Sequence, residues 1–165
     1  MTDITVRRLE NKDDVYQVFK DKAVFKHICD DYTKNPDDFC IDSMIESEYM
    51  HFIGAYIDNQ LAGVFYYHPH NHILYEVHSG VLPQYRGKNT ILMAIKSLEW
   101  IFENTDCLKV ITHVPENNAP ALALSKRVGM QIEGINRASI MKNNQLLDQT
   151  VLGITAEELS CQQQQ

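Results

Sequence analysis

At Val81-Leu82-Pro83-Gln84-Tyr85-Arg86-Gly87-Lys88-Asn89, a strand-like run ends and an amphipathic helix begins. A glycine-containing turn at such a junction leaves several backbone N–H groups without partners, in the positive field of the helix N-terminus. Groups of this kind bind phosphate. Arg86 and Lys88 add local positive charge to a chain whose net charge is −7, so the turn favours an anion. We therefore expect the pyrophosphate of a cofactor to bind here.

The turn belongs to a strand, helix, strand unit. The first strand is expected over residues 72–82 and the helix over residues 90–103. This helix has one apolar stripe, formed by Ile91, Ile95, Leu98 and Phe102. Residues 107–113 then form a short apolar run that is typical of a strand. Two strands joined in this way are expected to be parallel, with a right-handed crossover.

The segments before this unit begin with a strand and continue with helices. Residues 4–7 alternate between apolar and polar side chains, as in a half-buried strand. Helical apolar spacing follows, including a stripe made of Phe25, Ile28, Cys29 and Tyr32. Residues 51–57 and 61–67 predict two strands joined by a hairpin turn.

The segments after the unit predict a helix and a closing pair of strands. Asn118 is a good N-cap, and Gly129 suits the left-handed position that ends a helix. Residues 130–142 and 146–154 predict an antiparallel pair around Asn143 and Asn144.

Length and composition indicate a single domain. The chain has 165 residues, of which 44% are hydrophobic, and residues 1–155 are expected to form that domain. Residues 156–165, which end in a run of glutamines, are expected to be a disordered tail.

Charge and hydropathy exclude several classes of partner. A net charge of −7 argues against nucleic acid, because phosphate backbones require clustered cations. The sequence has neither a signal-peptide pattern nor an apolar run of the roughly 18–20 residues that a bilayer span needs. The 4 cysteines lack CxxC spacing and the density of a disulfide scaffold. We therefore expect a cytoplasmic protein with reduced thiols, no membrane partner and no nucleic-acid partner.

His68, His70 and His72 alternate along the chain, and alternate residues of a strand share one face. Pro69 and Asn71 between them favour a turn instead. No carboxylate or cysteine stands beside them in the sequence to complete a metal site. The pattern therefore favours a solvated hairpin turn, and we expect no metal.

From about His51 to Ile154, the order of elements and several motif residues resemble the GCN5-related N-acetyltransferases (GNATs), most closely the branch that acetylates ribosomal-protein N-termini. The acetyl-CoA motif of that family is Gln or Arg, two free positions, Gly, one free position, then Gly or Ala. This chain has Gln84 and Gly87, with Asn89 at the last position.

Further motifs extend the resemblance. The second family motif is an Asn before a helix that ends in Gly, here Asn118 and Gly129. The closing strands are also similar to the same branch, at Glu133, Gly134, Arg137 and Asp148. The resemblance implies an α/β (α+β) fold, with a GNAT-like mixed, mostly antiparallel twisted sheet of about six to seven strands, a central parallel pair and flanking helices.

The resemblance also implies acetyl-CoA as co-substrate, with its pyrophosphate on backbone N–H groups from Leu82 to Lys88. The residues expected to bind it are Val81, Leu82, Gln84, Tyr85, Arg86, Gly87, Lys88, Asn89 and Asn118. Lys126 and Arg127 either reach the adenosine 3′-phosphate or form a solvated basic face. Asn89 is larger than the small residue of the family, which puts tight cofactor binding in doubt.

Three residues are candidates for the chemistry. An amine is protonated in water at neutral pH, so acetyl transfer to it needs a base. Glu76 and His78 share one face of the strand before the turn. Glu76 is the expected base and His78 the alternative, although both also suit ordinary polar positions. Ser125 stands where many relatives have a tyrosine that protonates the leaving thiolate, and a serine is a poorer acid than a phenol.

The implied function is an N-acetyltransferase that moves an acetyl group from acetyl-CoA to a primary amine of a small molecule, protein or peptide, by direct attack with a general base. An acidic early segment would attract a cationic amine; it contains Asp30, Asp31, Asp37, Asp38, Asp42, Glu46 and Glu48. The alternative is a catalytically weak or inactive GNAT-fold protein that binds CoA or a protein partner, because of Asn89 and Ser125. The sequence leaves open whether the protein forms a homodimer.

Overall fold

The computed structural model describes residues 3–164 of the 165-residue chain. Its strands form one seven-stranded sheet in the order β1-β2-β3-β4-β5-β7-β6. The strands are β1 (Ile4–Arg8), β2 (His51–Ile57), β3 (Gln60–Pro69), β4 (Leu74–Val81), β5 (Lys109–Pro115), β6 (Gln131–Lys142) and β7 (Gln145–Thr155). The β4–β5 pair is parallel and every other pair of neighbours is antiparallel. The predicted mixed sheet with a central parallel pair is confirmed.

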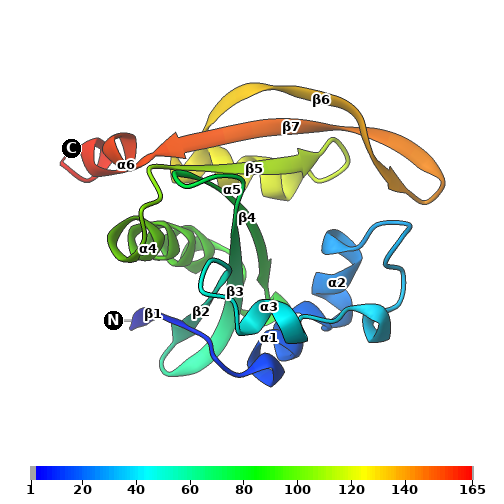
Figure 1. Ribbon diagram of the computed structural model, residues 1–165, viewed down its shortest axis with the longest axis horizontal. Coiled ribbons are helices and arrows are strands. Elements are labelled where there is room, and N and C mark those ends of the chain that lie inside the picture. The colour runs from blue at the N-terminus through cyan, green and yellow to red at the C-terminus, as the bar shows by residue number, and fades with distance from the viewer. Residues whose placement is uncertain (1–2, 165) are drawn as a thin grey trace.

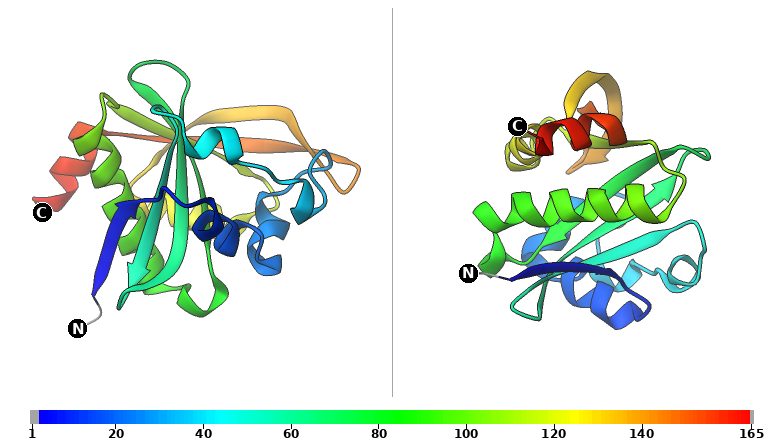
Figure 2. Two further views of the ribbon diagram at one scale, coloured as in Figure 1. Left: turned by 60° about the horizontal axis from the view of Figure 1, so that its bottom comes forward. Right: turned by 90° about the vertical axis from the view of Figure 1, so that its left-hand side faces the viewer.

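Helices cover both faces of this sheet. They are α1 (Lys12–Phe19), α2 (Lys22–Ile28), α3 (Asp42–Ile45), α4 (Lys88–Asn104), α5 (Ala119–Val128) and α6 (Ala156–Gln163), with short 3₁₀ turns η1 (Pro36–Asp38) and η2 (Pro83–Tyr85). Figure 1 shows the arrangement, and Figure 2 shows α4 on one face of the sheet with α1 and α2 on the other. Among residues 3–164, no helix combines the length and apolar character needed to cross a membrane.

Each face has its own apolar core. Tyr67 and Met93 are fully buried in the larger core, which α4 covers. Phe52 and Val18 belong to the smaller core beneath α1 and α2. Because strand residues alternate between the two faces, neighbouring residues of β3 and β4 enter different cores. Trp100 packs against the larger core beside His51.

Two local predictions differ from the structure. Tyr32 was placed in the apolar stripe of α2, but the helix ends at Ile28 and the Tyr32 side chain is 90% exposed. The tail from residue 156 was predicted to be disordered, but residues up to Gln163 form α6. Thr155 and Glu158 make a capping box at the start of this helix, and Leu159 is buried in the larger core. Gln165 and the first two residues lie outside the described part of the chain.

The parallel strands separate halfway along their length. β4 pairs with β5 from Leu74 to Glu76. Thr112 of β5 then donates a hydrogen bond across the gap to the Val77 carbonyl oxygen, at 3.2 Å. The second half of β4 lies beyond this point, and it leads directly into η2 and α4.

The β6–β7 hairpin is long and reaches the loop that follows α2 (Figure 1). The Asp31 carboxylate accepts hydrogen bonds from the backbone N–H groups of Asn143 and Asn144, at 2.8 and 2.7 Å. Lys142 also donates to the Lys26 carbonyl oxygen, at 2.7 Å. The hairpin turn is therefore fastened to the helical layer.

Candidate functional site

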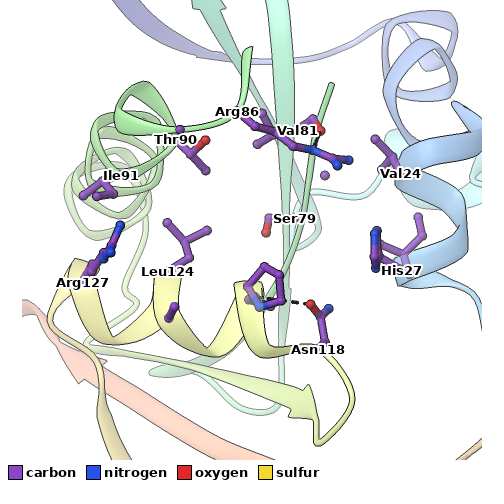
Figure 3. Close-up of a pocket in the computed structure, with 16 residues that line it drawn as sticks. Val24, His27, Ser79, Val81, Arg86, Thr90, Ile91, Asn118, Leu124 and Arg127 are labelled. Atoms are coloured by element: carbon purple, nitrogen blue, oxygen red, sulfur yellow. Dashed lines mark hydrogen bonds between the residues drawn. The ribbon is translucent and has the colours of Figure 1, made fainter. Parts of the chain in front are cut away.

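A cavity of about 380 Å³ opens at the end of β4, where α2, α4 and α5 meet (Figure 3). One side is formed by the Gly87 turn and the start of α4, and the opposite side by α2. The lining residues are Val24, His27, Ile28, Ser79, Gly80, Val81, Arg86, Gly87, Thr90, Ile91, Asn118, Pro120, Ala121, Ala123, Leu124 and Arg127.

The cavity combines positive charge with apolar walls. Arg86 and Arg127 line it, and its lining, taken over the described residues, includes no aspartate or glutamate. This is notable in a chain of net charge −7. Burial lowers the pKa of His27, and the nearby cations Lys26, Arg86 and Lys142 lower it further, so His27 is neutral at neutral pH. Such a cavity suits an elongated ligand with anionic groups and an apolar portion.

The Gly87 turn presents unpaired backbone donors. Gly87 has φ of +113° and ψ of −138°, a conformation that L side chains rarely adopt. Within residues 3–164, the backbone N–H groups of Gly87, Lys88 and Asn89 have no protein acceptor. They stand at the N-terminus of the 17-residue helix α4, where the field favours an anion.

The predicted row of phosphate-binding donors is wrong in its first half. The backbone N–H of Leu82 donates to the Ala62 carbonyl oxygen at 2.9 Å. Those of Tyr85 and Arg86 donate inside η2, at 3.0 and 3.3 Å. The Pro83 ring favours this tight turn, because proline is suited to its first position. Between Leu82 and Arg86 only the Gln84 N–H lacks a protein acceptor among the described residues, and Gln84 does not line the cavity, so the donors beside the cavity begin at Gly87.

The side chains of the predicted cofactor residues divide between two regions. Val81, Arg86 and Asn118 line the cavity. Gln84 and Tyr85 lie on another part of the surface, where the Tyr85 hydroxyl donates to Gln60 at 2.7 Å. Lys88 and Asn89 are not among the lining residues, but their backbone N–H groups follow Gly87 at the start of α4 without protein acceptors among the described residues. Leu82 is buried in the smaller core.

Arg86 has a structural task as well as a charge. Its Nε donates to the Val81 carbonyl oxygen at 3.0 Å, and a terminal nitrogen donates to the Ala23 carbonyl oxygen at 3.1 Å. The guanidinium therefore ties the end of β4 to α2 and forms part of the cavity wall (Figure 3).

Thr90 is a site residue that the sequence reasoning missed. It lines the cavity from the first turn of α4, and its Oγ1 is buried with no hydrogen-bond partner among the described residues. A buried hydroxyl without a partner is costly unless a ligand satisfies it. The only sequence signal that could have identified Thr90 as a site residue is its hydroxyl close to the expected N-terminus of the helix.

The far end of the cavity is formed by α5. The Asn118 side chain accepts a hydrogen bond from the Ala121 N–H at 3.3 Å, as the predicted N-cap (Figure 3). Gly129 ends the helix at φ of +99°, also as predicted. Of the two basic residues considered for the 3′-phosphate, Arg127 lines the cavity and Lys126 does not.

Glu76 lies at the centre of a histidine cluster rather than in an open position. Its side chain is buried in the sheet face toward α1 and α2, with 8% of the residue exposed. The carboxylate makes hydrogen bonds to His70 Nε2 at 2.7 Å and to His113 Nδ1 at 2.9 Å. Desolvation raises the pKa of Glu76, but the interactions with His70, His78 and His113 outweigh it, and the pKa is lowered overall.

This cluster corrects the interpretation of the histidine-rich turn. The sequence showed no carboxylate beside His68, yet the antiparallel register of β3 and β4 places Glu76 directly opposite it. His113 joins from β5, whose ladder with β4 runs through Glu76. Only His72 behaves as a solvated turn residue, paired with Asp106 at 3.2 Å and 83% exposed.

His78 and Ser125, the other catalytic candidates, lie in different surroundings. His78 is about half exposed and borders a second cavity. Desolvation by its neighbours lowers its pKa, and Glu76 partly offsets that effect. Ser125 lines a small pocket of about 50 Å³ between the separated strands and α5, where its hydroxyl donates to the Ala121 carbonyl oxygen at 3.0 Å.

The second cavity has a volume of about 230 Å³ and lies on the α1–α2 side of the sheet. Its walls are largely aromatic, and Asp30 supplies one carboxylate. Ile28 of α2 lines both cavities, so this helix stands between them. The lining residues are Phe19, Phe25, Ile28, Cys29, Asp30, Thr33, Phe39, Tyr66 and His78.

Known proteins are similar to this chain in sequence or in fold. A family model described as "Protein of unknown function (DUF2824)" matches residues 4–165. Protein p31 of Acyrthosiphon pisum secondary endosymbiont phage 1 is 23% identical over 154 residues, which cover 93% of this chain and 94% of that protein.

Two solved structures illustrate the structural similarity. Spermidine N-acetyltransferase from Vibrio cholerae, in complex with CoA and spermine, has a TM-score of 0.80 at 18% identity, covering 95% of this chain and 98% of that one. Ribosomal-protein-S5-alanine acetyltransferase from Vibrio fischeri has a TM-score of 0.72 at 12% identity, covering 94% of each chain. The chain has the GNAT fold that its motifs indicated.

Proposed function

This chain belongs to the family described as protein of unknown function DUF2824, and from its GNAT fold and its cationic cavity we propose that it is an acetyl-CoA-dependent N-acetyltransferase. Acetyl-CoA, when bound, supplies the acetyl group as an activated thioester. The acceptor is a primary amine that approaches from the α1–α2 side of the sheet.

The start of α4 carries this proposal. Gly87 and Thr90 line the same cavity as two arginines, and the backbone N–H groups from Gly87 to Asn89 lie at this helix end without protein acceptors among the described residues. Together they match the needs of a diphosphate, which accepts many hydrogen bonds and carries negative charge. The apolar walls between the arginines suit the less polar part of the same cofactor.

His78 is the better placed base on the acceptor side. Glu76 is buried and its two oxygens already face His70 and His113, whereas His78 borders the second cavity. With the Nε2 hydrogen of His78 shared with His68, the neutral imidazole takes at Nδ1 the proton that the amine loses. Glu76, with Oε1 at 3.6 Å from His78 Nε2, stabilises the imidazolium that forms. Glu76 is thus a positioning residue.

The second cavity favours a cationic acceptor. Four aromatic rings and the Asp30 carboxylate can attract an ammonium group before it is deprotonated. The similar Vibrio cholerae enzyme is described in complex with spermine. Polyamines are therefore the first acceptors to test, followed by amine-bearing antibiotics and basic peptides.

Labelled acetyl-CoA and an amine panel test the proposal. Purified protein is expected to transfer label to at least one amine and to release CoA in equal amount. Binding of CoA in a calorimetric titration without transfer to any amine would instead support a CoA-binding module. A folded protein that neither binds CoA nor transfers acetyl would refute the proposal.

Substitutions at the acceptor side test the assigned roles. His78→Asn is expected to lower kcat by about 100-fold, because general-base catalysis contributes about that much. Glu76→Gln is expected to lower kcat less and to leave the KM for acetyl-CoA unchanged, since it acts through His78. The exposed His72→Asn is the matched control and is expected to keep wild-type kinetics. Wild-type kcat in His78→Asn would remove His78 from the mechanism.

A further inference from the structure

The histidine cluster brings together more ligand-type atoms than the proposed acetyl transfer uses. His68 comes from β3, Glu76 and His78 from β4, and His113 from β5, while His70 follows from the turn after β3. The four rings surround a single carboxylate on one face of the sheet. Imidazole and carboxylate are the side chains that zinc-like cations prefer.

The separations inside the cluster are those of ligands that share one ion. His68 Nε2 lies 3.1 Å from His78 Nε2. Glu76 Oε1 lies 3.6 Å from His78 Nε2, and the other oxygen, Oε2, lies 3.8 Å from His68 Nε2. Two ligand atoms bound at about 2.0–2.1 Å to a tetrahedral zinc ion are about 3.3 Å apart. Small side-chain adjustments therefore suffice to place an ion among the three.

The rings that carry these atoms are packed against one another. The planes of His68 and His78 are nearly parallel, with an angle of 11° and centroids 5.2 Å apart. Tyr66 stacks against both rings, at 5.5 and 5.9 Å, and holds them in place. The two Nε2 atoms face each other across 3.1 Å on packed rings, so a limited rotation of each ring directs both toward one ion.

His70 and His113 are placed to support the Glu76 carboxylate rather than to bind an ion themselves. Each makes a hydrogen bond to a Glu76 oxygen. Partners of this kind orient a metal-binding carboxylate and contribute substantially to metal affinity. The cluster therefore has both the ligands and the residues that hold them.

We propose that His68, His78 and Glu76 bind a divalent transition-metal ion of the zinc type. Two histidines and one glutamate form a three-residue ligand set that leaves one tetrahedral position open. The ion takes the place of the hydrogen that the two Nε2 atoms otherwise share. The donating ring moves its proton to Nδ1, so both rings bind as neutral imidazoles and no proton is lost.

Metal binding has a consequence for the reaction. The ion uses the lone pairs of His78 and Glu76, so a protein with zinc bound has no free base at this position. Zinc therefore competes with acetyl transfer. This consequence rests on the proposed function, whereas the binding itself does not.

Calorimetric titration with Zn²⁺ alone tests the site. The untagged protein is first freed of metal with EDTA and is kept free of acetyl-CoA and amine. One equivalent of zinc is expected to bind. His68→Asn and His78→Asn are each expected to weaken binding by about 100-fold or more, and His113→Gln by about 10- to 100-fold. His72→Asn, on the same turn but outside the cluster, is expected to bind as the wild type does.

The ligand type is checked with Co²⁺, whose absorption reports coordination. Visible bands of a tetrahedral nitrogen and oxygen site are expected, and they should disappear in His68→Asn. Cys29, Cys40 and Cys161 are not buried, and a sulfur-to-cobalt charge-transfer band would show that they hold the ion instead. Circular dichroism and thermal unfolding establish whether each variant is folded. If His68→Asn does not fold, His113→Gln still tests the site.

The proposal is overturned if the folded wild type takes up no zinc, if the stoichiometry and affinity are unchanged in His68→Asn, or if cobalt binds through sulfur. These outcomes are separate from the proposed function. A protein that transfers acetyl but binds no zinc refutes only the metal site, and one that binds zinc but transfers no acetyl refutes only the enzymatic proposal.

Discussion

Gly87 holds a backbone conformation that only glycine adopts easily, and the phosphate-binding donors depend on it. Gly87→Ala adds strain of about 1–3 kcal/mol at a φ of +113°. Relief of that strain turns the adjacent N–H groups away from the cavity. CoA affinity measured by calorimetry is expected to fall by about 10-fold.

Gly134→Ala provides the matched control, because a Cβ at Gly134 meets nothing within 4 Å and its φ is not in the left-handed region. It is expected to bind CoA as the wild type does. Equal CoA affinity of the two alanine variants would contradict the assigned role of the Gly87 turn.

Thr90 gives a second test at the same helix end. Thr90→Val removes the unpartnered hydroxyl while keeping the shape of the side chain. Hydrogen bonds to charged groups contribute about 1.5–3 kcal/mol, so CoA should bind roughly 10- to 100-fold more weakly. Thr90→Ser keeps the hydroxyl and should restore most of the affinity. Failure of Thr90→Val to weaken binding would place the cofactor elsewhere in the cavity.

Individual site residues were predictable only where a local backbone rule applies. Gly87, Asn118 and Gly129 follow from turn and capping chemistry, which the sequence displays directly. The contact of His68 with Glu76 depends on the register between two strands, and the sequence does not display a register. Thr90 was missed because a hydroxyl beside a cavity has the same local pattern as one in solvent.

The C-terminal helix is the element whose existence the glutamine-rich composition concealed. Thr155→Val removes the hydroxyl that accepts the Glu158 N–H, at 3.2 Å, and should cost about 1 kcal/mol in the free energy of unfolding. Urea denaturation monitored by circular dichroism measures it. Thr5→Val on the exposed side of β1 should change the unfolding free energy by less than about 0.5 kcal/mol. Identical effects of the two substitutions would argue against the capping box.

The long elements were predicted well because their signals are redundant. The helix after Gly87 has an apolar stripe through its whole length, and the hairpins have turn residues at their tips. In contrast, Tyr32 fitted the spacing of α2 although the chain had already left the helix. Beyond Ile28, tertiary contacts and the Asp30 side chain, which accepts the N–H groups of Tyr32 and Thr33, override the periodicity.

At the scale of the whole molecule, a buried histidine makes stability depend on pH. Burial first, and the charge of Arg8 second, lower the pKa of His51 to about 4. His51 packs between the rings of Tyr75 and Trp100, and its Nδ1 has no partner among the described residues. The unfolded chain takes up a proton near pH 6.5 and the folded chain does not until near pH 4. Stability therefore falls as the pH drops between these values.

At pH 5, His51 should account for about 2 kcal/mol of this loss. Denaturant unfolding of the wild type and of His51→Phe between pH 7 and pH 5 measures the difference in slope, which should be smaller in the variant. His72→Asn is the control, since His72 is exposed, and it should keep the wild-type slope. Parallel pH curves for the wild type and His51→Phe would contradict the assignment.

The sheet as a whole could be anticipated because a strand, helix, strand unit followed by hairpins allows few arrangements. The sequence does not show how far each pair of neighbouring strands stays paired. The separation of β4 from β5 after Glu76 is a property of the assembled sheet, and no local pattern in the sequence displays it.

Two hydrogen bonds connect the Asp31 carboxylate to the β6–β7 turn. Their partners, Asn143 and Asn144, are separated from Asp31 by 112 and 113 positions in the sequence. Lys142 adds a third hydrogen bond between the same two regions, to the Lys26 carbonyl oxygen. Asp31 adjoins Asp30, which borders the aromatic cavity. These hydrogen bonds therefore hold one wall of the aromatic cavity against the closing hairpin.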